Sequence, residues 1–212
     1  DSSGEPFLLL TGPEPALAWD ALSTEISHLI DEFGVEQTVL LHSIPAPHPH
    51  TRPTQITEYA GKPGQSQGTF VINGTFKMSA SYQSRLAVVL DEAGKKVSGL
   101  IAHVPHYLAD VDYPDASICL LEGASRVSGL TLPTSALLPA AENVQAQLKS
   151  QVEDNPDLAH SIREYEHRFD QVMKERGLPG GIELIAEEDL PTADEIGREF
   201  EEYLKGLDQN DG

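Results

Sequence analysis

Residues 7–41 read FLLLTGPEPALAWDALSTEISHLIDEFGVEQTVLL, and this stretch decides the expected fold class. Its first four residues form a short apolar run ended by Thr-Gly-Pro, which is typical of a buried strand. From Ala16 to Phe33 apolar residues recur every three or four positions, which predicts a helix with one apolar face. That face should carry Trp19, Leu22, Ile26, Leu29, Ile30 and Phe33. Thr38 to Leu41 is a second apolar run, so strand, helix and strand form a βαβ unit and favour a parallel sheet covered by helices.

The alternation of strands and helices continues beyond this unit. A segment rich in Pro and Gly runs from Ser43 to Gly68, and a connection of that length is usually functional or disordered. Within it, residues 55–59 have the composition of a short strand. The Asn-Gly pair at 73–74 predicts a hairpin turn. The further elements expected are a helix over 79–93, a buried strand over 97–104 and a helix over 115–128.

After residue 133 the apolar pattern is only helical. Apolar stripes over 137–148 and 162–172 are separated by Asn155 and Pro156, which have the types preferred at a helix N-cap and first position. This pattern predicts an antiparallel helical hairpin that packs mostly on itself. Thr192 to Glu195 is a capping box that opens a last helix. The expected organisation is an α/β domain over 7–133, a helical hairpin over 134–178 and an acidic tail over 179–212.

The charge balance excludes several classes of partner. The 212 residues include 14 Lys and Arg against 34 Asp and Glu, a net charge of −20, and residues 183–212 contribute 2 basic and 11 acidic residues to it. Such acidity argues against nucleic acids and anionic membrane surfaces, because both would repel the chain. No apolar run approaches the roughly 20 residues needed to span a bilayer. The single Cys favours a reducing compartment, so a cytoplasmic location is expected.

Histidines follow two of the predicted strands. His48 and His50 come after the strand that ends near residue 41, and His103 and His106 lie at the end of the strand over 97–104. The carboxyl ends of parallel strands share one edge of the sheet, so these imidazoles could meet there with Asp110 and Asp112. Their spacing is interrupted by Pro and does not match common zinc motifs, so no metal is predicted. The alternative is that the imidazoles hydrogen-bond the loop backbone.

Two other motifs have ordinary explanations. Residues 64–68 match G-x-S-x-G, but Lys62 and Pro63 precede them where a nucleophile elbow needs an apolar strand. Cys119 lies within an apolar helical face with no basic residue near it in sequence, so an inert buried thiol is expected. Neither a Walker A loop nor a G-x-G-x-x-G fingerprint is present. No cofactor is therefore predicted.

Three segments together resemble a known family. They are Gly12-Pro13-Glu14-Pro15 followed by Trp19, then Pro49-His50-Thr51-Arg52-Pro53, then Val104-Pro105-His106-Tyr107-Leu108. In this order and at these separations they are similar to the bacterial, mainly actinobacterial, branch of the proteasome assembly chaperone family. The resemblance covers most of residues 7–176 and does not include the acidic tail.

The resemblance implies a fold and a class of function. The fold is a three-layer α/β/α sandwich similar to the phosphorylase/hydrolase-like fold, to which the helical hairpin and the acidic tail helix are appended. Eukaryotic members help proteasome α-subunits to assemble, and archaeal relatives are implicated in proteasome binding. The family usually begins with a further strand and helix, including a Gly-Trp-rich turn, which this sequence does not show before residue 7. The hydrophobic-Tyr-any C-terminus of some members is not matched by the end of this chain, Gln209 to Gly212.

Three functional hypotheses follow. The favoured one is a protein-binding or assembly factor, a homo-oligomer with a protein partner, for which the proteasome is one candidate. The alternative is a small-molecule-binding enzyme of hydrolase or phosphorylase type, in which Arg52 holds an anion and His106 acts as acid or base beside His50. The third is a purely structural homo-oligomer. The residues of the candidate pocket or structural motif are Glu14, His48, His50, Thr51, Arg52, His106, Tyr107 and Asp110. Arg52 should anchor its loop by pairing with Glu14 or Asp110.

Overall fold

The central strand of the sheet is β3 (Val97–Pro105), and all of its residues are buried. The computed structural model describes residues 1–60 and 81–176. In it, β1 (Thr38–Ala46) pairs with β3 in parallel, from Thr38 opposite Val97 to Ala46 opposite Pro105. On the other side of β3, β2 (Ile56–Ala60) pairs antiparallel to it. Among the described strands the sheet is therefore mixed, with the predicted parallel pairing between β1 and β3 and an antiparallel pairing between β3 and β2.

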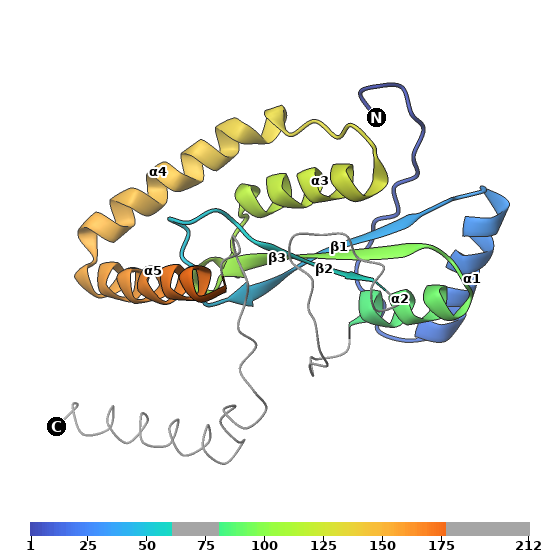
Figure 1. The fold of residues 1–212 in the computed structure, drawn as a ribbon, viewed down its shortest axis with the longest axis horizontal. Helices are drawn as coiled ribbons and strands as arrows, with labels where there is room; N and C mark the ends of the chain where they lie inside the picture. The colour runs from blue at the N-terminus through green and yellow to red at the C-terminus, as the bar shows by residue number, and fades with distance from the viewer. Residues whose placement is uncertain (61–80, 177–212) are drawn as a thin grey trace, which may run out of the picture. The chain divides into compact units, whose positions relative to one another are not determined.

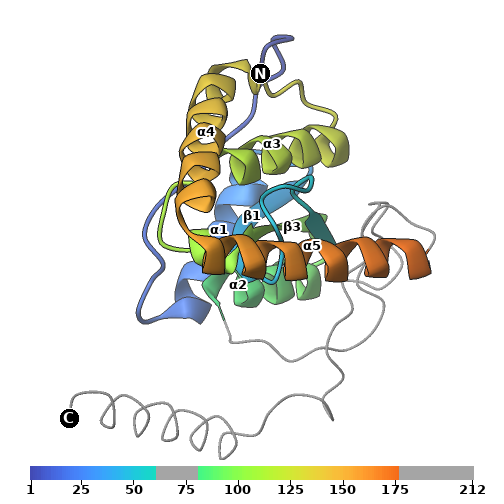
Figure 2. The same cartoon turned by 90° about the vertical axis from the view of Figure 1, so that its left-hand side faces the viewer.

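Helices flank the sheet on both faces (Figures 1 and 2). α1 and α2 cover one face, and α3 covers the other with α4 beside it. α5 follows α4 after a short turn. The helices are α1 (Trp19–Glu32), α2 (Tyr82–Glu92), α3 (Pro114–Ser128), α4 (Leu138–Asp154) and α5 (Pro156–Arg176), with short 3-10 turns at His106–Leu108 and Ser135–Leu137. The described part of the chain thus has a mixed α/β fold with flanking helices, and α4 and α5 follow the sheet.

Each face of the sheet has its own hydrophobic cluster. The cluster under α1 and α2 consists of Ile26, Ile30, Leu40, Tyr82, Leu86, Ala87, Leu90 and Val97. The cluster under α3 and α4 consists of Ile56, Ala102, Val104, Leu108, Tyr113, Ala116 and Leu148. Alternate residues of β3 serve opposite clusters, because successive side chains of a strand point to opposite faces. These two layers on one short sheet explain why all residues of β3 are buried, including the polar Ser98 and His103.

Local signals set several of the helix ends, and the start of α5 was predicted from them. The Asn155 side chain accepts hydrogen bonds from the backbone N–H groups of Asp157 and Leu158, so it is the N-cap of α5. Ser81 caps α2 by accepting from the Ser84 N–H. α3 ends at Gly129, whose positive φ of 79° suits a left-handed C-terminal residue. The expected strands over 55–59 and 97–104 and the expected helix over 115–128 are confirmed within a residue or two.

Residues 7–10 are not a buried strand, so the first element predicted from the sequence is wrong. Phe7, Leu8, Leu9 and Leu10 are exposed by 49% to 79% and have no backbone hydrogen bond to another described residue. A strand needs a neighbour for its N–H and C=O groups, and no described strand lies beside this run. The observed parallel crossover instead runs from β1 through α2 to β3.

The apolar surface of α1 is divided between the core and the solvent. Ile26 and Ile30 are buried in the cluster under the helix, and Trp19 packs against it. Leu22, Leu29 and Phe33, predicted to share that buried face, are exposed by 38%, 45% and 61%. The helix begins at Trp19, after Ala18 with a φ of 60°, and the Trp19 Nε1–H donates to the Pro15 carbonyl oxygen at 2.6 Å. The apolar surface of α1 is therefore wider than the sheet can cover.

The two C-terminal helices do not pack mainly on each other, which corrects the predicted hairpin seam. Leu148 of α4 is buried in the cluster with α3 and β3, and Val144 packs against the same cluster. α5 contacts the loop that follows β1 through Arg52 and His48. Figure 2 shows α4 and α5 diverging from their shared turn. Their apolar stripes are narrow because each helix contacts a different part of the α/β core.

Several sequence-based expectations lie outside the described residues. They are the G-x-S-x-G match at 64–68, the hairpin turn at 73–74, the first residues of the helix expected over 79–93, and the tail with its capping box at 192–195. Within residues 1–60 and 81–176, no helix has the length and apolar character required to cross a bilayer.

Candidate functional site

The carboxyl ends of β1 and β3 bring two of the sequence motifs together. The loop after β1 and the 3-10 turn after β3 meet at His50 and Tyr107. The Tyr107 hydroxyl accepts a hydrogen bond from the His50 backbone N–H at 2.9 Å and lies 2.8 Å from His50 Nδ1. With its one proton the hydroxyl can donate to Nδ1 while it accepts from the N–H, which matches a neutral imidazole. Burial also lowers the pKa of His50, against the opposing effect of Glu166 and Asp115.

Arg52 fastens the same loop to α5. Its Nε–H and Nη2–H donate to the two carboxylate oxygens of Asp170 at 2.8 and 2.6 Å, and Nη1 lies 3.3 Å from a Glu166 oxygen. The Thr51 hydroxyl donates to the same Glu166 oxygen. The hydrogen bond from Arg52 holds the pKa of Asp170 below its usual value. A two-pronged guanidinium contact of this kind fixes orientation as well as distance, because the fork matches the carboxylate.

Aromatic contacts extend the attachment of α5. The His48 ring meets the Phe169 ring edge-on with centroids 5.0 Å apart, and the Tyr107 and Tyr165 rings are stacked at 6.4 Å. His48 is buried, and its Nε2 has no hydrogen-bond partner among the residues that the structure describes. Burial lowers its pKa, which backbone hydrogen bonds at Arg52 and Pro53 partly oppose. Rings and carboxylates of α5 therefore hold the whole loop in place.

His103 forms a polar contact inside the sheet. Its Nε2 lies 2.9 Å from the Thr57 hydroxyl of β2, and both residues are buried. Burial, with a further contribution from nearby His48, lowers the pKa of His103 to about 4. The imidazole is therefore neutral at pH 7, and its main role here is to link β3 to β2.

The remaining predicted site residues lie elsewhere. His106, Asp110 and Asp112 are exposed, so the four imidazoles and two acids do not form one cluster. Glu14 accepts a hydrogen bond from the Tyr82 backbone N–H at 2.6 Å, at the start of α2. The expected partners of Arg52 were thus wrong, because Glu14 is engaged by α2 and Asp110 points to solvent, while α5 offers two carboxylates. The structure brings together His48, His50, Thr51, Arg52 and Tyr107.

Sequence reasoning missed the α5 half of this arrangement. The residues concerned are Tyr165, Glu166, Phe169 and Asp170. A usable signal was present, since Glu166 and Asp170 are four positions apart and so lie on one side of a helix. Nothing in the sequence, however, identifies which loop that side contacts.

The side chains of this site contact one another, so their evident role is structural and not the binding of a substrate. Arg52 has both prongs on Asp170, and the buried Nδ1 of His50 is engaged by Tyr107. The Cys119 thiol donates to the Thr54 carbonyl oxygen, and burial raises its pKa to about 11, so it stays protonated at neutral pH. In the part of the chain that the structure describes, no group of three or more His, Cys, Asp or Glu side chains is placed to hold a metal ion.

Comparisons with known proteins place the chain among relatives. A family model described as PAC2 family matches residues 1–152. A protein of unknown function from Corynebacterium glutamicum is similar at 34% identity and a TM-score of 0.74, over 82% of this chain and 65% of that one. Another of unknown function, from Mycobacterium tuberculosis, is similar at 33% identity and a TM-score of 0.77, over 84% of this chain and 60% of that one. The chain thus spans less than two thirds of the length of these relatives.

A more distant similarity concerns the fold. A Mycobacterium tuberculosis protein described as a proteasome-assembly chaperone homologue has 23% identity and a TM-score of 0.63, over 70% of this chain and 63% of that one. Among curated proteins, none matches this sequence.

Proposed function

We propose that this chain, which belongs to the PAC2 family, is a protein-binding factor that holds a partner polypeptide against α1. One protein with the same fold, from Mycobacterium tuberculosis, is described as a proteasome-assembly chaperone homologue. We therefore take proteasome α-subunits as the first partner to test, and a second copy of this chain as the competing occupant. We also propose that the fold is the three-layer α/β/α sandwich of the phosphorylase/hydrolase-like type.

The observation that carries the proposal is the exposed apolar stripe of α1, formed by Leu22, Leu29 and Phe33. Spacings of seven and four residues place the three side chains on one side of the helix. Burying a Leu or Phe side chain stabilises an association by about 1.5–3 kcal/mol, so this stripe could supply several kcal/mol to an interface. Exposed apolar surface of this kind typically marks a protein interaction site.

The loop geometry supports the protein-binding function over the enzymatic alternative. An anion site would need a free guanidinium, whereas Arg52 is bound to Asp170 and Glu166. An acid or base beside His50 was expected from His106, which faces solvent instead. The loop is instead held to α5 by ion pairs and ring contacts, and a surface whose conformation is fixed before binding costs less to order in an interface.

The test compares two triple variants of the full chain. The first, Leu22→Gln, Leu29→Gln and Phe33→Gln, removes the stripe. The second removes three exposed apolar side chains elsewhere, as Val88→Gln, Val111→Gln and Leu138→Gln. Self-association is measured by sedimentation velocity, and binding to purified actinobacterial proteasome α-subunits by biolayer interferometry.

We expect the stripe variant to weaken one of the two associations more than tenfold, because at least about 1.5 kcal/mol is lost per buried side chain. The control variant should bind like the unmodified chain. Equal loss in both variants, or no association of the unmodified chain in either measurement, would overturn the proposal.

A further inference from the structure

α5 separates its charges between two sides. Glu166 and Asp170 are turned toward Arg52 and the loop after β1. The outer side of the helix instead presents a row in which cations outnumber acids. We call this the basic row; it consists of His160, Arg163, Glu164, His167, Arg168 and Gln171, and the exposed Lys174 follows it by three residues. Arg52 engages both inner carboxylates, and its single positive charge offsets one of the two negative charges.

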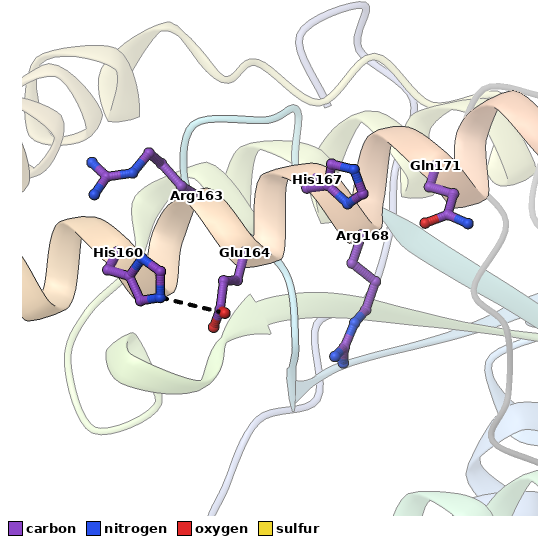
Figure 3. Close-up of a pocket in the computed structure, with 6 residues that line it drawn as sticks. All are labelled: His160, Arg163, Glu164, His167, Arg168 and Gln171. Atoms are coloured by element: carbon purple, nitrogen blue, oxygen red, sulfur yellow. Dashed lines mark ion pairs between the residues drawn. The ribbon is translucent and has the colours of Figure 1, made fainter.

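The two arginines of the basic row lack acidic partners within the described chain. Neither Arg163 nor Arg168 forms an ion pair there, and both are exposed. The single acid of the row, Glu164, lies 3.5 Å from His160 Nε2. Figure 3 shows Arg163 and Arg168 extending away from each other, with the paired His160 and Glu164 between them. Two guanidinium groups are therefore available for external carboxylates.

The basic row also lines a hollow in the surface. The hollow has a volume of about 480 Å³, and the described residues that line it are the six of the row. Its lining includes guanidinium and imidazole groups, which are hydrogen-bonding groups suited to a polar ligand. Arginine on such a surface favours carboxylates, because its planar fork can bind both oxygens of one group.

We propose that the basic row is a docking site for an acidic segment of a partner protein. The argument is charge complementarity. The chain carries a net charge of −20, so most of its surface repels an acidic segment, whereas the basic row attracts it and thereby fixes where it docks. This site is separate from the α1 stripe, and neither proposal depends on the other.

The experiment measures fluorescence anisotropy of a labelled twelve-residue peptide of alternating Glu and Ser, titrated with the full chain. The variant Arg163→Gln/Arg168→Gln should bind the peptide about 5- to 10-fold more weakly, as expected for two exposed charge contacts. Glu164→Gln removes the only acid of the row and should bind it about 2- to 5-fold more tightly, a gain that misfolding cannot produce. Lys149→Gln, an exposed cation on α4, is the matched control and should change nothing.

Binding of the acidic peptide should also weaken when salt rises from 50 to 500 mM, because exposed charges are screened. The proposal is overturned if the peptide does not bind, if Lys149→Gln weakens binding as much as the double variant, or if Glu164→Gln leaves it unchanged. A single-stranded oligonucleotide of equal charge is the second probe. Tighter binding of that oligonucleotide, lost in the double variant, would replace the acidic protein segment with a nucleic acid and so also overturn the proposal.

Discussion

Arg52 joins the loop after β1 to α5 with one guanidinium and two carboxylates. The pair with Asp170 is two-pronged, and the contact with Glu166 adds a third distance within 3.3 Å. The side chains are partly exposed, 30% for Arg52 and 54% for Asp170, so water and salt screen their attraction. The ion pair therefore contributes mainly by fixing the conformation of the loop. The loop is rich in proline, and the contact with α5 selects one of its conformations.

Replacing Arg52 should loosen the loop more than an ordinary surface ion pair would suggest. We expect Arg52→Ala to lower the free energy of unfolding by about 1 kcal/mol, and Arg52→Lys to recover less than half, because an ammonium cannot form the two-pronged contact. Urea unfolding followed by circular dichroism measures both. Arg85→Ala, which removes a single contact with Asp20 at 2.8 Å, is the control and should cost about 0.5 kcal/mol or less. Equal effects at both arginines would mean that the loop does not rely on Arg52.

His103 should make stability depend on pH. Burial lowers its folded-state pKa to about 4, below the ordinary value of 6.5, so between these values the unfolded chain binds more protons than the folded one. Stability is therefore complete above about pH 6.5 and falls as the pH drops toward 4. From pH 7 to pH 5 this group should cost about 2 kcal/mol.

The pH dependence is measured as urea midpoints at several pH values. His103→Gln keeps a polar group near Thr57 without the titration, so its slope over this range should be smaller than that of the unmodified chain. His28→Gln, which replaces an exposed imidazole on α1, is the comparison variant. An unchanged slope in His103→Gln would show that other groups, such as the buried His48, carry the dependence.

At the scale of the elements, β3 is held between two layers, and the packing at Gly99 leaves no room for a side chain. A Cβ added at Gly99 would overlap the ring of Tyr59 on the neighbouring strand β2. The Tyr59 ring in turn packs against the cluster under α1 and α2 and meets His42 of β1 edge-on at 5.9 Å. The missing side chain of Gly99 thus lets rings from both outer strands lie over the central one.

Gly99→Ala should therefore be strongly destabilising. The Tyr59 ring would have to leave its position, which we expect to lower the free energy of unfolding by about 2–3 kcal/mol, the upper part of the range for overpacked cores. Gly12→Ala is the matched control, since nothing lies within 4 Å of an added Cβ there, and it should change stability by less than about 0.5 kcal/mol. Thermal unfolding of the two variants gives the comparison, and similar values would contradict the packing described here.

The elements also differ in how well the sequence predicts them. Apolar period and caps were sufficient for β3, α3 and the start of α5, because those signals are local. The strand predicted at residues 7–10 was wrong, because four consecutive apolar residues form a strand only if another strand is present to pair with them. The solvent exposure of Leu22, Leu29 and Phe33 could not be predicted either, because it depends on how much of α1 the sheet covers.

For the whole molecule, the sequence predicts that the motifs after β1 and β3 lie close together, but it does not predict the contacts that hold them in place. Parallel pairing of β1 with β3 follows from their apolar runs, and it brings His50 to Tyr107 as expected of strands that end at one edge. The partners of Arg52 come from α5, more than a hundred residues away, and only the packing of α5 selects them. Family membership was likewise recognisable from three short segments, whereas the exposed stripe of α1 that we propose for binding became visible only in the structure.

The central claim is that a partner polypeptide lies on the α1 stripe, and site-specific photocrosslinking tests it most directly. A benzophenone amino acid is placed at Leu29 in the stripe or, as the control, at Val111, which is exposed on the loop before α3. Each full-length protein is irradiated alone and with purified proteasome α-subunits, and the products are identified by mass spectrometry. We predict crosslinks from position 29 to one of these two partners and none from position 111. Crosslinks only from position 111, or none from position 29 while association persists, would contradict the account.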